Sequence, residues 1–137
     1  MSVVLEAREL TRHYEISRGL FKPNALVRAL NGVSFELEAG KTLAVVGESG
    51  CGKSTLLNTL GCLDTPSSGE YLLDGIPVRT MSKNERAILR NRKIGFVFQS
   101  YNLLAKTTAI ENVELPLMYN AAINATERKN RAVEALK

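Results

Sequence analysis

Residues 47–54, GESGCGKS, have the side chains and the spacing that phosphate binding requires. Gly47 and Gly52 would let backbone N–H groups approach phosphate oxygens closely, because glycine has no Cβ. Lys53 adds a cation for the outer phosphates, and the Ser54 hydroxyl is a suitable ligand for Mg²⁺. The loop and the residue after it form the predicted contact set: Gly47, Glu48, Ser49, Gly50, Cys51, Gly52, Lys53, Ser54 and Thr55.

Two flanking elements would have to position this loop. The stretch TLAVVG, 42–47, is apolar on both faces, which is typical of a strand covered on both sides. The stretch STLLNTLGCL, 54–63, has Leu56, Leu57 and Leu60 at helical spacing. A helix that begins there would present unpaired N–H groups and a positive dipole end to an anion. The alternative is an ordinary glycine-rich turn between a strand and a helix.

The remaining patterns predict a mixed α/β chain without repeats. Strand-like stretches are bounded by turn residues at 3–10, 32–40, 69–75 and 94–99. Helical patterns, two of which start at capping-box spacing, lie at 82–91, 107–120 and 124–137. The stretch 15–30 contains Gly19 and Pro23 and is predicted mostly as a loop, and Pro116 is expected to disturb the end of its helix.

Composition limits the classes of protein that this chain can represent. With 137 residues, 45% of them hydrophobic and 23% charged, it fits one globular domain. No apolar run approaches the roughly 20 residues of a membrane helix, and the N-terminus lacks a signal peptide, so we expect a cytoplasmic chain. Two cysteines and one histidine favour neither a disulfide framework nor a zinc site.

The net charge of +4 is modest. Basic residues gather in ERAILRNRK, 85–93, which we interpret as a solvated helix face rather than a nucleic-acid or lipid patch, and we expect no nucleic-acid partner. Cys62 is expected in the core. Cys51, inside the loop, is interpreted as a space-filling residue, with a redox role as the alternative.

Three motifs together resemble those of ABC transporter ATPases. The stretch 47–75, GESGCGKSTLLNTLGCLDTPSSGEYLLDG, is similar to the Walker A region of that family. The stretch IGFVFQSYNLL, 94–104, resembles its Q-loop, and LTRHYE, 10–15, resembles its A-loop. The motifs occur in the family's order over essentially the whole chain. The resemblance implies a partial P-loop NTPase core, the antiparallel β-subdomain of ABC ATPases and the start of the helical subdomain, all in one truncated nucleotide-binding domain, 1–137.

The resemblance also implies ligands, roles and partners. ATP and Mg²⁺ would bind, Tyr14 would stack on adenine, and Gln99 would contact Mg²⁺ and the attacking water. Residues 101–108 would face membrane transporter subunits, at the inner face of the membrane. The alternatives are a core or rim aromatic for Tyr14 and a polar strand end for Gln99.

The chain also departs from the family's pattern. Residues 1–60 resemble peptide-importer ATPases, whereas 61–120 resemble lipoprotein-release and macrolide-exporter ATPases, which suggests a chimera. The 137 residues contain no LSGGQ signature, Walker B carboxylates or switch histidine. We therefore expect ATP binding with little or no hydrolysis, and self-association through open sheet edges.

Two alternatives to the transporter interpretation follow from the residues. One is a P-loop kinase or GTPase, although no N-K-x-D motif occurs. The other is an engineered fragment or assembly module that binds nucleotide incidentally.

Overall fold

The structure, a computed structural model, describes residues 2–19 and 23–137. It divides into two compact units, Met1–Arg92 and Lys93–Lys137, and each is described by itself. The strands form one sheet in the order β2-β1-β3-β4, with bounds Val3–Ile16 (β1), Ala25–Glu38 (β2), Ser68–Leu73 (β3) and Ile76–Pro77 (β4). The helices are Lys53–Leu60 (α1), Lys83–Lys93 (α2), Ala109–Met118 (α3) and Ala125–Ala135 (α4).

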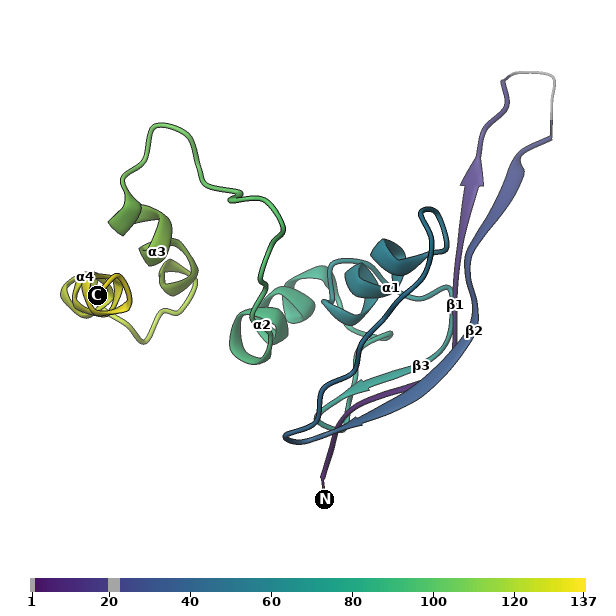
Figure 1. Cartoon of the computed structure of the whole chain (residues 1–137), viewed down its shortest axis with the longest axis horizontal. Helices are drawn as coiled ribbons and strands as arrows, with labels where there is room; N and C mark the ends of the chain where they lie inside the picture. Colours follow the sequence, from purple (N-terminus) through teal and green to yellow (C-terminus); the bar gives the residue numbers. More distant parts are fainter. Residues whose placement is uncertain (1, 20–22) are drawn as a thin grey trace. The chain divides into compact units, whose positions relative to one another are not determined.

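A long antiparallel ribbon of β1 and β2 is the main feature of the first unit (Figure 1). Its register runs from Val3 opposite Glu38 to Ile16 opposite Ala25, which confirms the strands predicted at 3–10 and 32–40. The loop predicted for 15–30 was largely wrong, since only 17–19 and 23–24 of its described residues lie outside the strands, and 20–22 are outside the described residues. Apolar residues along 25–30 extend the ladder past the turn signals at Gly19 and Pro23.

The strand predicted at 69–75 is confirmed as β3, which pairs antiparallel with the other edge of β1. The ladder is interrupted between Arg8 and Thr11, where Glu9 adopts a φ of 47°. A Cβ on Gly69 would overlap with the Glu9 carbonyl oxygen, so this crossing requires glycine. The bulge therefore lies at the start of β3, where this strand joins the ribbon.

The core of the first unit lies where the sheet meets α1. Leu10 and Tyr71 are 0% and 1% exposed, and Cys62 is buried as predicted. The Tyr71 hydroxyl donates to the Leu60 carbonyl at 2.6 Å, which ties β3 to the end of α1. Burial raises the pKa of both Tyr71 and Cys62, as expected for groups withdrawn from water.

The helix predicted at 82–91 is confirmed as α2, with its capping box. The Ser82 N–H donates to Glu85 Oε2 at 2.8 Å, and the Glu85 N–H donates to Ser82 Oγ at 3.3 Å. Two residues of the basic run have local structural partners: Arg86 donates to the Met81 carbonyl and Arg90 to the Cys62 carbonyl. The interpretation of the run as a solvated helix face stays a prediction.

The second unit contains α3 and α4, which pack against each other. Thr108 caps α3 in a full capping box with Glu111, and Asn124 accepts from the Glu127 N–H at the start of α4. Both predicted helices are confirmed. α3 continues two residues beyond Pro116, so the proline lies within the helix.

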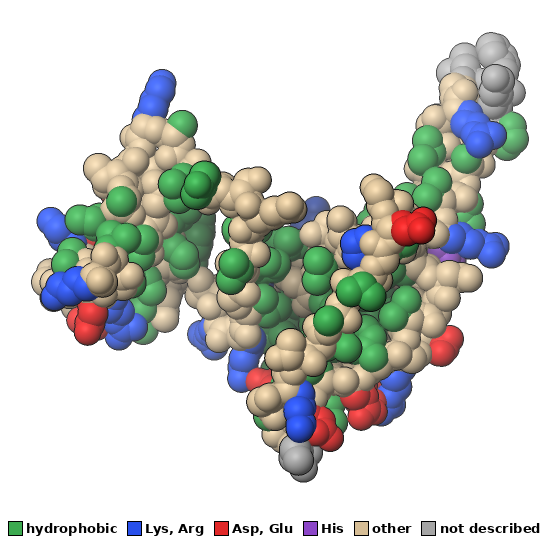
Figure 2. All heavy atoms as spheres, in the orientation of Figure 1, with side chains coloured by type: hydrophobic (Ala, Val, Ile, Leu, Met, Phe, Trp, Pro, Cys, Tyr) green, Lys and Arg blue, Asp and Glu red, His purple; other side chains and the backbone are tan. Residues whose placement is uncertain are grey.

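Two predicted strands were wrong. Residues 41–48 and 94–98 have no regular secondary structure, and Val46 and Val97 are 87% and 101% exposed. A strand that is apolar on both faces is stable only between neighbours and covering layers, and no strand among the described residues pairs with either stretch. Figure 2 shows hydrophobic side chains at the surface, and the exposed ones in these stretches are Leu43, Val46, Phe96, Val97 and Phe98.

Candidate functional site

The glycine-rich loop leads directly into an uncapped helix. A turn brings the Cys51 N–H to 3.4 Å from the Glu48 carbonyl oxygen, and Gly52 is the N-cap of α1 with a φ of 93°. No side chain caps α1, and the first backbone bond to the cap runs from the Leu56 N–H to the Gly52 carbonyl at 2.9 Å. The first N–H groups of the helix are therefore available to an anion, with the positive end of the helix dipole behind them.

Gly52 also joins the loop to the ribbon. The β1–β2 ladder skips Ala29, because Arg12 is opposite Leu30 and His13 is opposite Arg28. A Cβ on Gly52 would overlap with the Ala29 carbonyl oxygen. The end of the loop thus rests on β2 at a bulge, at a distance that only glycine permits.

The Lys53 side chain folds back over the loop. Its ammonium donates to the Gly47 carbonyl, to the Glu48 carbonyl at 2.8 Å and to Cys51 Sγ at 3.7 Å. A Cβ on Gly47 would lie 2.5 Å from Cys51 Sγ, so this glycine makes room for the thiol. The loop therefore has a positive charge at its centre, and the exposed Cys51 thiol lies near it.

The other loop residues are placed around this centre. Ser49 and Gly50 form an exposed turn, and the Ser54 side chain is exposed in the first turn of α1. Thr55 is partly buried, and its carbonyl accepts from Thr59 Oγ1 at 2.9 Å. The loop residues predicted from spacing thus lie in one loop and in the first turn of the helix that follows it.

The described residues do not gather three His, Cys, Asp or Glu side chains at any point that could hold a metal ion. Mg²⁺ commonly binds through one or two protein ligands, substrate phosphates and water. Ser54 is exposed in the first turn of the uncapped helix, so its hydroxyl is the loop's candidate metal ligand. The residues present therefore suit a metal that arrives with phosphates.

Tyr14 lies on the same stretch of ribbon as the loop's end. It is opposite Val27 on β2, two residues from the Ala29 bulge that receives Gly52. Its hydroxyl donates to Asp64 Oδ2 at 2.8 Å, and the Arg12 guanidinium lies 4.5 Å from the centre of its ring. The ring is partly buried, so it is neither a core aromatic nor a free surface side chain.

Arg12 and Asp64 form an ion pair that sequence analysis missed. Arg12 Nη2 lies 2.8 Å from Asp64 Oδ1, and Arg12 Nε donates to Oδ2 at 2.8 Å. Burial alone would raise the pKa of Asp64, but hydrogen bonds from Tyr14 and Thr65 and the charge of Arg12 lower it overall. Burial opposes the charge on Arg12 as well, yet its partners Tyr14 and Asp64 raise its pKa.

Gln99 belongs to the second unit, whereas the loop and Tyr14 belong to the first. Its side chain is exposed, as are Tyr101 and Leu103 after it, at 93% and 67%. The structure thus places the loop and Tyr14 in one unit and leaves the role of Gln99 a prediction.

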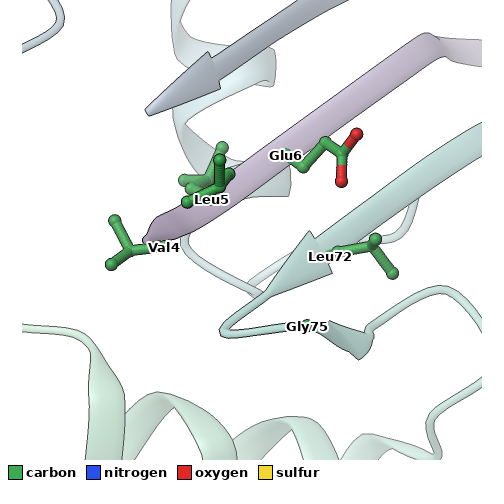
Figure 3. A pocket seen from close by; sticks show the side chains of 6 residues that line it. Val4, Leu5, Glu6, Leu72 and Gly75 are labelled. Carbon is green, nitrogen blue, oxygen red and sulfur yellow. The ribbon is translucent and has the colours of Figure 1, made fainter. Parts of the chain in front are cut away.

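A shallow hollow at the start of β1 offers no second site (Figure 3). Its lining is mostly apolar: Val3, Val4, Leu5, Glu6, Leu72 and Gly75. Glu6, its ionisable member, is paired with Arg8.

In the part of the chain that the structure describes, every helix falls short of the length and apolar character that a bilayer crossing needs.

Comparison with known proteins assigns the family. The sequence profile of the ABC transporter family matches residues 30–137, and the chain therefore belongs to the ABC transporter ATPases. The di/tripeptide transport ATP-binding protein DppF of Pseudomonas aeruginosa is 52% identical over 139 residues, which cover 100% of this chain and 43% of DppF. The macrolide export ATP-binding/permease protein MacB of Brucella abortus is 49% identical over 127 residues, 93% of this chain and 20% of MacB.

A solved relative has the same fold. The ATP-binding cassette MJ0796 of Methanocaldococcus jannaschii, in a dimeric post-hydrolysis state bound to ADP and Pi, superposes with a TM-score of 0.82 at 38% identity. The match covers 96% of this chain and 55% of that one. The predicted fold class is thereby confirmed. This chain spans less than two thirds of each of these relatives.

The two similarities each extend over nearly the whole chain. They do not separate residues 1–60 from 61–120, so the chimera stays a prediction. The family match favours the ABC interpretation over the P-loop kinase or GTPase.

Proposed function

We propose that residues 47–55 bind the phosphates of ATP with Mg²⁺, as the nucleotide-binding portion of an ABC ATPase that powers membrane transport in the complete protein. One observation carries this proposal: the uncapped start of α1, beside an ammonium held inside a glycine loop. Cation, N–H donors and hydroxyl converge from consecutive residues, as phosphate binding requires.

Each residue has a role in this proposal. N–H groups of the loop and of the first turn of α1 would hold phosphate oxygens, Lys53 the outer phosphates and Ser54 the Mg²⁺. The metal, when bound, neutralises phosphate charge. Tyr14 would stack on adenine, which its place beside the loop's end supports.

Titration calorimetry of ATP with Mg²⁺ tests the proposal. We expect binding by the chain and its loss in Lys53→Ala, because the ammonium is the loop's cation. Lys83→Ala is the matched control, since Lys83 is an exposed lysine at the start of α2. Equal binding by all three proteins would contradict the assignment of the loop.

We infer that these 137 residues alone hydrolyse ATP slowly or not at all. Phosphoryl transfer needs a group that orients the attacking water, and the residues include neither a Walker B carboxylate nor a signature motif. A phosphate-release assay checks this inference. A rate well above background that is lost in Lys53→Ala would show that another group acts.

The remaining family roles are proposals for the complete protein. Residues 1–137 would belong to one nucleotide-binding domain at the cytoplasmic face of a membrane, with transporter subunits near 101–108 and Gln99 at the metal and water. The names of DppF and MacB, a transport ATP-binding protein and an ATP-binding/permease protein, support this class of partner. No nucleic acid is included, since Arg86 and Arg90 of the basic run have protein partners.

Self-association, as in an assembly module, is a second candidate. The extended stretches 41–48 and 94–98 expose apolar side chains, and their backbone groups lie outside the sheet. Such stretches pair readily with another copy of the chain. Light scattering over a range of concentrations should therefore show oligomers, and a monomer at high concentration would contradict this proposal.

A further inference from the structure

We propose that Arg12 and Asp64 are positioning residues that hold the Tyr14 ring ready to stack on a nucleotide base. This inference rests on the proposed ATP site and adds to it two residues that do not touch phosphate. We call the three side chains the Arg12–Tyr14–Asp64 clamp.

The Asp64 carboxylate is the centre of the clamp, and three hydrogen bonds and one ion-pair contact hold it. Oδ2 accepts from Tyr14 Oη and Arg12 Nε, both at 2.8 Å. Oδ1 accepts from the Thr65 N–H at 2.8 Å and lies 2.8 Å from Arg12 Nη2. A carboxylate held by two side chains and its own backbone has little freedom to rotate, so it fixes the Tyr14 hydroxyl in space.

Arg12 holds the same ring from one face. Its guanidinium carbon lies 4.5 Å from the Tyr14 ring centroid, within the range of a cation–π contact. The Arg12 and Asp64 side chains are 23% and 25% exposed, so the pair is partly shielded from water. With the hydroxyl and one face engaged, a base can stack on the accessible part of the ring without first ordering it.

The clamp also links β1 to the segment that follows α1. Arg12 and Tyr14 come from β1, whereas Asp64 follows α1, whose N-terminus ends the phosphate loop. Gly52 rests on Ala29, next to the positions opposite Arg12 and His13. The contact at Gly52 and the clamp thus attach both ends of α1 to the same stretch of ribbon, which sets the ring relative to the phosphates.

Two ligands separate a positioning role from a structural one. ATP with Mg²⁺ contacts both the ring and the loop, whereas tripolyphosphate with Mg²⁺ contacts the loop alone. Both are titrated into the chain and into the variants Tyr14→Ala, Tyr14→Phe, Arg12→Gln, Asp64→Asn and Tyr14→Phe/Asp64→Asn. Circular dichroism confirms that each variant is folded.

We expect Tyr14→Ala to weaken ATP binding about tenfold, the size of a lost base–aromatic stack. Arg12→Gln, Asp64→Asn and Tyr14→Phe should each weaken it about threefold, the effect of one modest hydrogen bond. The double variant should be weaker than wild type by less than the product of its two single effects, because both remove the same bond. Tripolyphosphate affinity should stay unchanged throughout.

Glu70→Gln is the matched control. It removes the exposed 3.3 Å ion pair between Glu70 on β3 and Arg8 on β1. Arg12 and Tyr14 also lie on β1, but this ion pair is not part of the clamp. Affinity for both ligands should equal that of the wild type. A loss of ATP binding in this variant would mean that β1 as a whole, and not the clamp, sets the affinity.

The outcomes are distinct. An equal loss of ATP and tripolyphosphate binding in Asp64→Asn would assign the clamp a merely structural role and overturn the inference. Full ATP affinity in Arg12→Gln and Asp64→Asn would also overturn the inference. Equal affinity of the wild type for ATP and tripolyphosphate would overturn it too. In both cases the proposed phosphate site would still stand. If the wild type bound neither, the proposed function itself would fail, and the inference with it.

Discussion

The β1–β2 ribbon and residues 41–48 are both rich in β-forming residues, yet only the ribbon forms strands. β1 and β2 follow each other closely in the chain and pair antiparallel over 14 residues each. Residues 41–48 follow the turn at Gly40 after β2, have no regular secondary structure and are mostly exposed. Most exposed positions of the ribbon are polar, although Leu26 and Val27 are exposed too, whereas 42–47 is apolar apart from Thr42.

This difference shows what each kind of strand needs. A half-buried antiparallel strand needs one neighbour and one covered face, which a connection of a few residues can supply. A strand that is apolar on both faces needs neighbours on each side and cover above and below. Among the described residues, β1 and β3 provide the first kind of environment and no element provides the second.

Truncating one side chain in each region should give the largest difference in stability between the two regions. Leu10, on β1, is fully buried, so Leu10→Ala should lower the free energy of unfolding by about 2–5 kcal/mol. Val46→Ala should change it by less than about 0.5 kcal/mol, because Val46 is 87% exposed. Urea unfolding followed by circular dichroism measures both, and comparable losses would mean that 42–47 packs into the core in solution.

Glycine substitutions test the point where the loop joins the ribbon. Gly50 and Gly52 both have positive φ, 81° and 93°, so alanine strains either one. A Cβ at Gly50 meets nothing within 4 Å, whereas one at Gly52 overlaps with the Ala29 carbonyl. Gly52→Ala should therefore be less stable than Gly50→Ala by about 1–3 kcal/mol, the size of an overpacking effect.

Thermal unfolding of the two variants checks this prediction. Equal stabilities would show that the loop does not rest on β2 and that the contact between Gly52 and the ribbon is weak.

The smallest effect is expected from acid. The pKa of Asp64 is lower in the folded chain than in the unfolded chain, so its ionised form contributes stability that is complete above about pH 4. This contribution disappears as the pH falls through the lowered pKa, because the carboxyl group must then be protonated. Asp64→Asn, which has no such proton to bind, should be less stable than the wild type at neutral pH.

Unfolding curves of the two proteins between pH 2 and 7 measure the contribution, over a range set by the ordinary carboxyl pKa of about 4. The difference in stability should narrow toward the acid end. A constant difference across this range would assign the effect of the substitution to packing instead of charge.

Local signals in the sequence predicted the elements that local interactions stabilise. Ser82 with Glu85 and Asn124 with Glu127 mark helix starts because each pair bonds within one turn. The strand predicted over 42–47 could not be tested by local signals. Its composition indicates a buried environment but does not identify the elements that would surround it. The full length of the ribbon was missed for a similar reason: pairing with β1 overrides the loop character of 25–30.

The site was predictable to the same degree. The loop was found from the spacing of Gly47, Gly52, Lys53 and Ser54, which lie within a few residues of one another, and its phosphate contacts stay a prediction. The Arg12–Tyr14–Asp64 clamp joins residues 50 or more positions apart, and no periodicity relates an arginine on a strand to an aspartate after a helix. Only the fold brings them together.

The folded-back Lys53 has a consequence for how any anion reaches the loop. The ammonium already has acceptors in the Gly47 and Glu48 carbonyls, so a phosphate bound as proposed would have to replace them. Measured affinity is then the difference between two hydrogen-bonded arrangements of one side chain. The loop acts as its own weak competitor, and this internal competition favours anions that carry enough charge to displace two neutral carbonyls together.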